Sequence, residues 1–106
     1  MGQFVESSQK LSITQWGSIC LGDLNGDSSI DVFIGNYGKP NEIWLNNGKG
    51  KFADTGMRLG DDETTGLSAL GDLDSDGDLD LFVALFGEGS NSIWLNERPD
   101  IKIKDN

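Results

Sequence analysis

Oxygen-bearing side chains recur at alternate positions in two decapeptides of the chain. The segments read GDLNGDSSID at 22–31 and GDLDSDGDLD at 71–80. Counted from the first aspartate, oxygen ligands fall at positions 1, 3, 5 and 9, and position 7 can offer its backbone carbonyl. Alternate residues of a tight loop converge on one point, and calcium accepts about six to eight such hard oxygens at loosely defined angles. The sequence therefore predicts two calcium sites, formed by Asp23, Asn25, Asp27, Ser29 and Asp31 and by Asp72, Asp74, Asp76, Asp78 and Asp80.

The two predicted sites differ in ligand strength. The first loop has three carboxylates and the neutral Asn25, and Ser28 stands where the second loop has Gly77. We expect the first site to be weaker, because it carries less charge and because Ser28 must adopt or avoid a left-handed turn that suits glycine. A metal-free turn is the alternative for either loop. An EF-hand is excluded, because position 12 is Ile34 or Val83 where that motif needs a carboxylate.

The net charge of −10 belongs largely to these loops, since without their eight aspartates it would be −2. Such acidity favours hard cations and argues against nucleic acid or anionic lipid as partners, because both are recognised by clustered Lys and Arg. The chain has no histidine and one cysteine, Cys20, so we expect neither an enzyme nor an internal disulfide. We also expect no membrane span and no signal peptide, because long apolar runs are lacking and the start reads MGQFVESSQK.

The two loops belong to a longer internal repeat. The matching pairs are 21–24 with 70–73 and 32–34 with 81–83 at an offset of 49, 41–46 with 91–96 at an offset of 50, and 2–11 with 50–59 at an offset of 48. We therefore divide the chain into repeat 1 over 1–49 and repeat 2 over 50–106.

Each repeat is expected to form four short strands, because its apolar runs are rich in Ile, Val, Leu, Phe and Trp and end at Gly, Asn, Asp and Ser clusters. The expected strands of the first four-stranded unit are 17–21, 30–37, 42–46 and 52–59, the last of which lies beyond the repeat boundary at 49. Those of the second unit are 66–70, 79–86, 92–96 and, as one candidate, 100–104. Consecutive apolar residues at the strand centres indicate that both faces of each sheet are covered. The sequence therefore predicts an all-β fold of stacked antiparallel sheets.

The repeats resemble the FG-GAP/VCBS repeats of integrin α-chain β-propellers and of many bacterial extracellular proteins. The resemblance rests on LGDLDSDGDLDLFV at 70–83 and its weaker copy at 21–34. It implies two four-stranded antiparallel propeller blades in tandem, with the calcium loops on one face and ligands bound on the other. The candidate ligand-binding residues on that other face are Trp16, Asn36, Tyr37 and Asn41.

Two functions follow from this resemblance. The first is a calcium-binding module for binding or adhesion to a carbohydrate or a protein. The alternative is a purely structural, self-assembling propeller fragment with no ligand beyond calcium. Because extracellular calcium modules bind with a Kd of about 10⁻⁴ to 10⁻³ M, we expect the parent protein to work outside the cell or at its surface.

Two blades are too few to close a propeller, which needs about four to eight. We therefore expect a homo-oligomeric ring, a trimer or a tetramer, in which residues 2–11 act as a closing outer strand beside 93–95 of a neighbouring copy. The tail DIKIKDN at 100–106 competes for the same position within one chain. A fragment of a longer propeller, with the missing blades in the same chain, is the remaining alternative.

Overall fold

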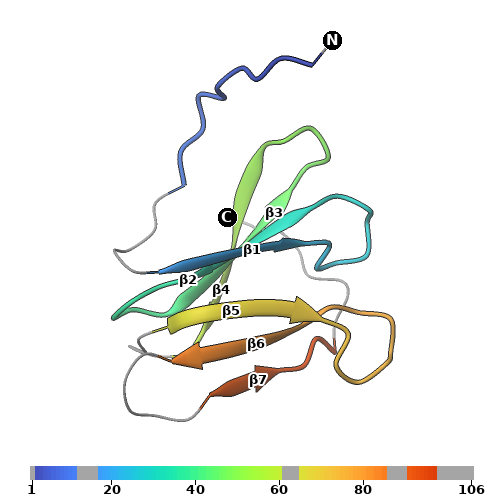
Figure 1. Ribbon diagram of the computed structural model, residues 1–106. Helices are drawn as coiled ribbons and strands as arrows, with labels where there is room; N and C mark the ends of the chain where they lie inside the picture. Colours follow the sequence, from blue (N-terminus) through green and yellow to red (C-terminus); the bar gives the residue numbers. More distant parts are fainter. Residues whose placement is uncertain (1, 12–16, 61–64, 86–90, 98–106) are drawn as a thin grey trace.

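The computed structural model is all-β and consists of two antiparallel sheets (Figure 1). It describes residues 2–11, 17–60, 65–85 and 91–97, which form seven strands and no helix. The strands are β1 (Ser18–Gly22), β2 (Asp31–Gly35), β3 (Asn41–Asn46), β4 (Phe52–Leu59), β5 (Thr65–Gly71), β6 (Asp80–Leu85) and β7 (Ser92–Trp94). The predicted fold class is confirmed, and no helix long and apolar enough to cross a membrane lies in the described residues.

The first sheet has the strand order β1-β2-β3-β4, so each strand pairs with its neighbour in the sequence. All five residues of β2 are buried, and the apolar run 32–34 at its centre predicts this burial. Every strand expected in the first four-stranded unit is present, with bounds that agree to within two residues. The sequence pattern therefore predicts a complete four-stranded blade here.

The second sheet has three strands among the described residues, in the order β5-β6-β7. Leu81 of β6 pairs with Leu70 of β5 and with Trp94 of β7, as Val32 pairs with Leu21 and Trp44 in the first sheet. The candidate fourth strand at 100–104 lies outside the described residues. As described, β7 forms an edge of the second sheet.

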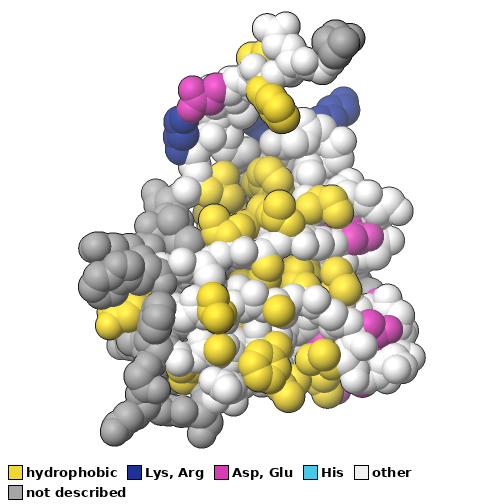
Figure 2. Space-filling view, in the orientation of Figure 1, with side chains coloured by type: hydrophobic (Ala, Val, Ile, Leu, Met, Phe, Trp, Pro, Cys, Tyr) yellow, Lys and Arg dark blue, Asp and Glu magenta, His cyan; other side chains and the backbone are white. Residues whose placement is uncertain are grey.

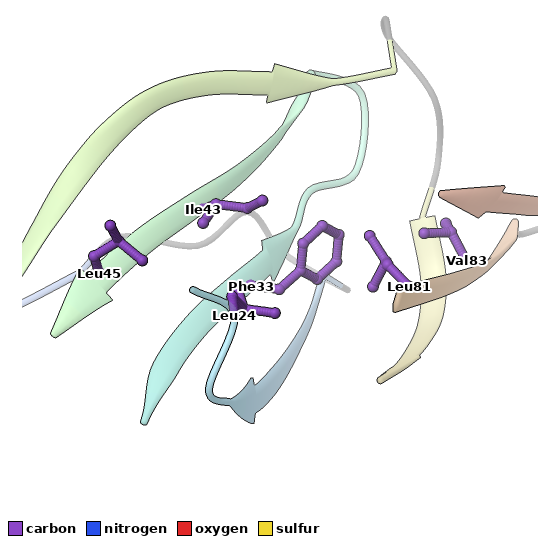
Figure 3. Packing of buried hydrophobic residues seen from close by; sticks show 6 residues of the cluster. All are labelled: Leu24, Phe33, Ile43, Leu45, Leu81 and Val83. Atoms are coloured by element: carbon purple, nitrogen blue, oxygen red, sulfur yellow. The ribbon is translucent and has the colours of Figure 1, made fainter. Parts of the chain in front are cut away.

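The two sheets stack face to face over an apolar core (Figures 1 and 3). Its buried members are Leu24, Phe33, Ile43 and Leu45 from the first repeat and Leu81 and Val83 from the second. Phe33 of β2 faces Leu81 of β6 across the interface, and both side chains are at most 5% exposed. Each full burial of such a side chain stabilises the stack by about 1.5–3 kcal/mol, so the pair of sheets forms one packed unit.

A close approach joins the end of β2 to the start of β5. A Cβ on Gly35 would lie 2.6 Å from Cγ2 of Thr65, so only glycine allows this contact. The backbone N–H of Thr65 donates to the carbonyl of Asn36 at 3.1 Å. The first blade is thereby tied to the second beside their shared core.

Large apolar side chains remain exposed on the strands of both sheets, and Figure 2 shows apolar side chains gathered on one face of the molecule. Leu21 and Leu67 of the innermost strands are 62% and 72% exposed, and Ile93 of β7 is 59% exposed. Strand faces as apolar as these are normally covered by another layer. Within one copy the described residues leave them open.

Residues 2–11 form no strand within a single copy. They run along the side of the first sheet that faces away from the second sheet (Figure 1), and Phe4 is fully exposed. The side-chain amide of Gln9 donates to the carbonyl of Phe52 at 2.5 Å and accepts from its N–H at 2.9 Å. The expected role of this segment as an outer strand is therefore not fulfilled inside its own chain.

Candidate metal centres

The two acidic loops occupy equivalent places in the fold. One joins β1 to β2 and the other joins β5 to β6, so both lie at the same edge of the stacked sheets (Figure 1). In the first loop, oxygens of three carboxylates lie within 4.8 Å of one another. In the second loop, oxygens of four carboxylates lie within 4.8 Å of one another. The clustered groups are Asp23, Asp27 and Asp31, and Asp72, Asp74, Asp76 and Asp80. Each cluster could hold a metal ion.

The first aspartate of each loop holds the turn together. Asp23 accepts hydrogen bonds from the N–H groups of Gly26 and Ser28, both at 2.8 Å. Asp72 accepts from those of Asp76 at 3.1 Å and Gly77 at 2.8 Å. The chain therefore wraps around a carboxylate, which brings the alternate side chains of the loop to one side.

Each loop contains two residues with left-handed backbone. In the first loop these are Gly26 at φ 77° and Ser28 at φ 73°, and in the second they are Ser75 at φ 62° and Gly77 at φ 92°. The glycine and the serine are exchanged between the loops, so each loop bears one non-glycine residue in this conformation. Our expectation that Ser28 weakens the first loop relative to the second is wrong, because Ser75 carries the same strain.

Replacing either serine by glycine should stabilise the protein slightly. A left-handed non-glycine residue costs about 1–2 kcal/mol, and the greater unfolded-state freedom of glycine offsets part of the gain. We expect Ser28→Gly and Ser75→Gly each to raise the free energy of unfolding in EDTA by about 0.5–1 kcal/mol, measured by chemical denaturation. Ser29→Gly is the matched control, since Ser29 lacks a positive φ. An equal gain in that control would contradict the strain argument.

The last aspartate of each loop is buried and links the loop to the third strand. Asp31 accepts from the N–H groups of Leu24 and Asn46, both at 2.9 Å. Asp80 accepts from Leu73 at 2.8 Å and from Asn96 at 2.7 Å. These carboxylates can bind an ion with their remaining lone pairs while they hold the end of the third strand of each sheet.

Asn46 and Asn96, the partners of these aspartates, were not predicted from the sequence. Both residues end the repeated motif that reads NEIWLN in one copy and NSIWLN in the other. Asn46 also accepts the N–H groups of Gly48 and Gly50 through Oδ1, at 2.9 and 3.0 Å. The recurrence of an asparagine at the same place in both repeats was the signal that could have identified them.

The electrostatics of the loops disfavour four bare carboxylates side by side. Desolvation raises the pKa of Asp74 and of Asp78 above the usual range, and the negative charge of Asp76 adds to both shifts. Burial likewise raises the pKa of Asp31, although its two backbone N–H partners oppose the shift. The N–H of Asn96 lowers the pKa of Asp80, with burial acting against it. A bound cation would relieve the repulsion in both clusters.

The remaining predicted ligands fit an oxygen-donor site. Oδ1 of Asn25, at position 3 of the first loop, is buried and has no hydrogen-bond partner among the described residues. A buried acceptor without a partner is unfavourable, and an ion would satisfy it. At position 7, Ser29 and Asp78 donate their N–H groups to Asp27 and Asp76, both at 2.9 Å. The Asp78 side chain is not part of the carboxylate cluster.

The predicted ligand face does not assemble as expected. Asn36 and Asn41 are 0% and 1% exposed. Asn41 accepts the N–H of Asn36 at 2.8 Å and the hydroxyl of Thr65 at 3.0 Å, and Asn36 donates to a carboxylate oxygen of Glu42 at 3.0 Å. These side chains stabilise the turn between β2 and β3 and its contact with β5. Tyr37 is 38% exposed, and Trp16 lies outside the described residues.

The second repeat shows why Asn41 serves the fold. Its counterpart Asn91 accepts the N–H of Leu85 at 3.3 Å, which repeats the bond from Asn36 to Asn41. A residue used in the same way by both repeats belongs to the blade framework. The repetition at 41 and 91 could have indicated this from the sequence.

Comparison with known families gave a match to a repeat family. A family model described as an FG-GAP-like repeat matches residues 23–83, which run from the first aspartate of the first loop to Val83 of β6 and include both acidic clusters. The match covers more than half of the chain. Comparisons with curated proteins and with solved structures gave no match.

Proposed function

The chain belongs to the FG-GAP-like repeat family, and from this premise we propose that it is a calcium-binding β-propeller module for binding or adhesion. The proposal has three parts: calcium in the two loops, a ligand on the opposite face and assembly of several copies into a closed ring. The observation that carries it is the pair of oxygen clusters at equivalent places in the two repeats.

Calcium is the cation that suits these loops. Their donors are carboxylate, amide and carbonyl oxygens, without nitrogen or sulfur ligands in the clusters. Magnesium demands octahedral geometry and retains water, whereas calcium tolerates the irregular angles of a short loop. Two bound calcium ions would change the formal charge from −10 to −6. The first site remains the weaker one in this proposal, because it has one carboxylate fewer.

The ligand is proposed to be a carbohydrate or a protein on the face opposite the calcium loops. Tyr37 supports this, because a partly exposed aromatic ring in a strand connection can stack on a sugar or contact a peptide. Among the described residues, Asn36 and Asn41 support the backbone beneath it rather than contact a ligand. A weak calcium site of this type functions at extracellular calcium concentrations, which supports an extracellular or cell-surface location.

A binding function is favoured over catalysis. The conspicuous carboxylates either cluster as candidate ligands or accept backbone N–H groups, and the chain has no histidine to act as a base. The alternative is a structural propeller fragment with no ligand other than calcium. It is supported by the burial of Asn36 and Asn41, which removes two of the four residues expected to bind.

A glycan array probed with the calcium-loaded protein tests the binding function. We expect binding that Tyr37→Ala reduces at least about tenfold, with Lys39→Ala, an exposed residue of the same turn, as the control. Binding that is unaffected by Tyr37→Ala would contradict the assigned face. Blank arrays, together with no captured protein ligand, would favour the structural alternative.

A further inference from the structure

The second blade has an apolar cavity beside its edge strand. The cavity has a volume of about 290 Å³ and lies between the two sheets. Met57 and Leu59 of β4 line one side, and Leu81, Trp94 and Leu95 of the second blade line another. In the first blade β4 covers the outer edge of β3, whereas no described strand covers the equivalent edge of β7.

Residues 2–11 match β4 in sequence. GQFVESSQKL at 2–11 aligns with GKFADTGMRL at 50–59 without a gap, so Phe4 corresponds to Phe52 and Leu11 to Leu59. β4 is the outer strand of a complete blade. The N-terminal segment is therefore a second copy of the strand type that is missing from the described part of the second blade.

The same segment already makes the local contacts of β4. Glu6 forms an ion pair with Lys10, and Asp54 forms the equivalent ion pair with Arg58 at 2.6 Å. The N–H of Gln9 donates to the hydroxyl of Ser7 at 3.1 Å, and the N–H of Met57 donates to that of Thr55, also at 3.1 Å. In β4 these contacts accompany the irregular register opposite β3. The free segment is thus pre-shaped for the same kind of pairing, which lowers the entropy lost when it pairs.

Residues 2–11 lie on the far side of the first sheet from the second blade of their own copy, so they do not pair with its β7 there. The segment lies beyond the first sheet, on the side away from β7 (Figure 1), and the Gln9 side chain binds the backbone of Phe52 there. In an assembly of copies, a blade stacked on that outer side of the first sheet would be the second blade of a neighbouring chain. Its β7 would lie next to the segment.

We propose that residues 2–11 of one copy form the fourth strand of the second blade of another copy, antiparallel to its β7. Asp54 pairs with Trp44 and Phe52 pairs with Asn46, so the equivalent register places Glu6 opposite Trp94 and Phe4 opposite Asn96. Phe4 then lies on the face of β7 that carries Trp94, whose side chain lines the cavity. This inference rests on the proposed propeller function and names the partner as a second copy of the chain.

Phe4→Asp tests the inserted strand. Phe4 is fully exposed within one copy, so its replacement does not disturb the core of an isolated chain. We expect light scattering to give a multi-chain mass for the wild type with calcium, and Phe4→Asp to weaken assembly at least about tenfold. Lys49→Gln is the control, because it makes the net charge more negative by the same one unit in an exposed turn outside the proposed pairing, and it should leave the mass unchanged. A wild-type mass of one chain, or equal assembly of Phe4→Asp, would overturn the proposal.

Mixed disulfide formation tests the register and the partner together. In the first blade the N–H of Asn47 donates to the carbonyl of Lys51 at 3.0 Å. Gln3 corresponds to Lys51 and Glu97 to Asn47, so the same register places Gln3 opposite Glu97. In a Cys20→Ala background, one tagged chain carries Gln3→Cys and an untagged chain carries Glu97→Cys. On oxidation we expect the mixed dimer in excess over either chain linked to itself, because only contact between copies joins them. A double variant that forms its disulfide within one chain would overturn the proposal.

The melting temperature with and without calcium separates this inference from the calcium proposal. A chain that is stabilised by calcium but remains a monomer would refute the exchanged strand and favour the tail at 100–106 as the competing segment. A chain that assembles through Phe4 but ignores calcium would support the exchanged strand and refute the metal sites.

Discussion

Millimolar calcium should raise the melting temperature of this protein by about 10 °C or more relative to excess EDTA. At about 10 mM calcium, a site with a Kd of about 0.1–1 mM contributes about 1.4–2.7 kcal/mol, and two sites act together. In a domain of this size each kcal/mol shifts the melting temperature by about 4–8 °C. Differential scanning calorimetry at fixed ionic strength measures the shift.

Magnesium at the same concentration is the control for nonspecific screening of the acidic loops. It should give a much smaller shift, because a short loop with irregular angles suits calcium better. Asp76→Ala should reduce the calcium-induced shift more than Asp27→Ala, since Asp76 belongs to the cluster with four carboxylates. If calcium and EDTA give the same melting temperature, neither loop is a calcium site.

In EDTA, protonation of the aspartates should partly replace the stabilisation that calcium provides. The raised pKa values of Asp31, Asp74 and Asp78 mean that the folded state binds protons more tightly than the unfolded state. Their protonation therefore stabilises the fold as the pH falls from neutrality towards the usual carboxyl pKa of 3.8. Asp80 acts in the opposite direction, because its pKa is lowered and its contribution is lost only below 3.8. We expect the metal-free melting temperature to rise between about pH 7 and 4 and the calcium-induced shift to shrink over the same range.

Much of the fold could be predicted because the repeat encodes it twice. Short apolar runs of β-branched and aromatic residues, each ended by a turn cluster, predicted the seven described strands to within two residues. The spacing of aspartates predicted which carboxylates converge, because alternate residues of a tight loop point the same way. Both signals are local, and both depend on residue types and intervals that are visible in the sequence.

The predictions that differ from the structure concern polar residues in turns. Asn36 and Asn41 looked available in a connecting segment, but their hydrogen bonds to Glu42 and Thr65 depend on contacts that a linear sequence does not show. Ser28 was expected to weaken the first loop because Gly77 occupies its position in the second loop. The second loop has Ser75 where the first has Gly26, so each loop has one serine with a positive φ. In both cases the residues were correctly assigned to turns. What the sequence did not show was which residue each one contacts or matches in the folded chain.

Asp31→Ala should destabilise the protein by about 2–4 kcal/mol even in EDTA. The Asp31 side chain is fully buried, and its two oxygens accept the N–H groups of Leu24 and Asn46. Alanine would leave both donors without a partner, and each buried unsatisfied donor costs about 1–3 kcal/mol. Urea denaturation with and without calcium measures the loss in both states.

Asp27→Ala is the matched control for a residue that is only a candidate ligand. Asp27 is exposed and accepts the N–H of Ser29 at 2.9 Å, so its removal leaves no buried donor unpaired. In EDTA we expect its stability to stay within about 0.5 kcal/mol of the wild type, because the lost bond is exposed and the repulsion within the cluster falls. In calcium it should be clearly less stable than the wild type.

The two variants together separate the structural use of the loop from its use as a metal site. If Asp31→Ala is as stable as the wild type in EDTA, the hydrogen bonds to Leu24 and Asn46 do not anchor the third strand. Asp31→Asn tests the same point more finely, because one amide oxygen can still accept one of the two N–H groups while the amide nitrogen faces the other. The free energy of unfolding of Asp31→Asn in EDTA should therefore lie between the values for Asp31→Ala and the wild type. In calcium this variant should lose much of the stabilisation from the first loop, since a neutral group would replace one of only three carboxylates.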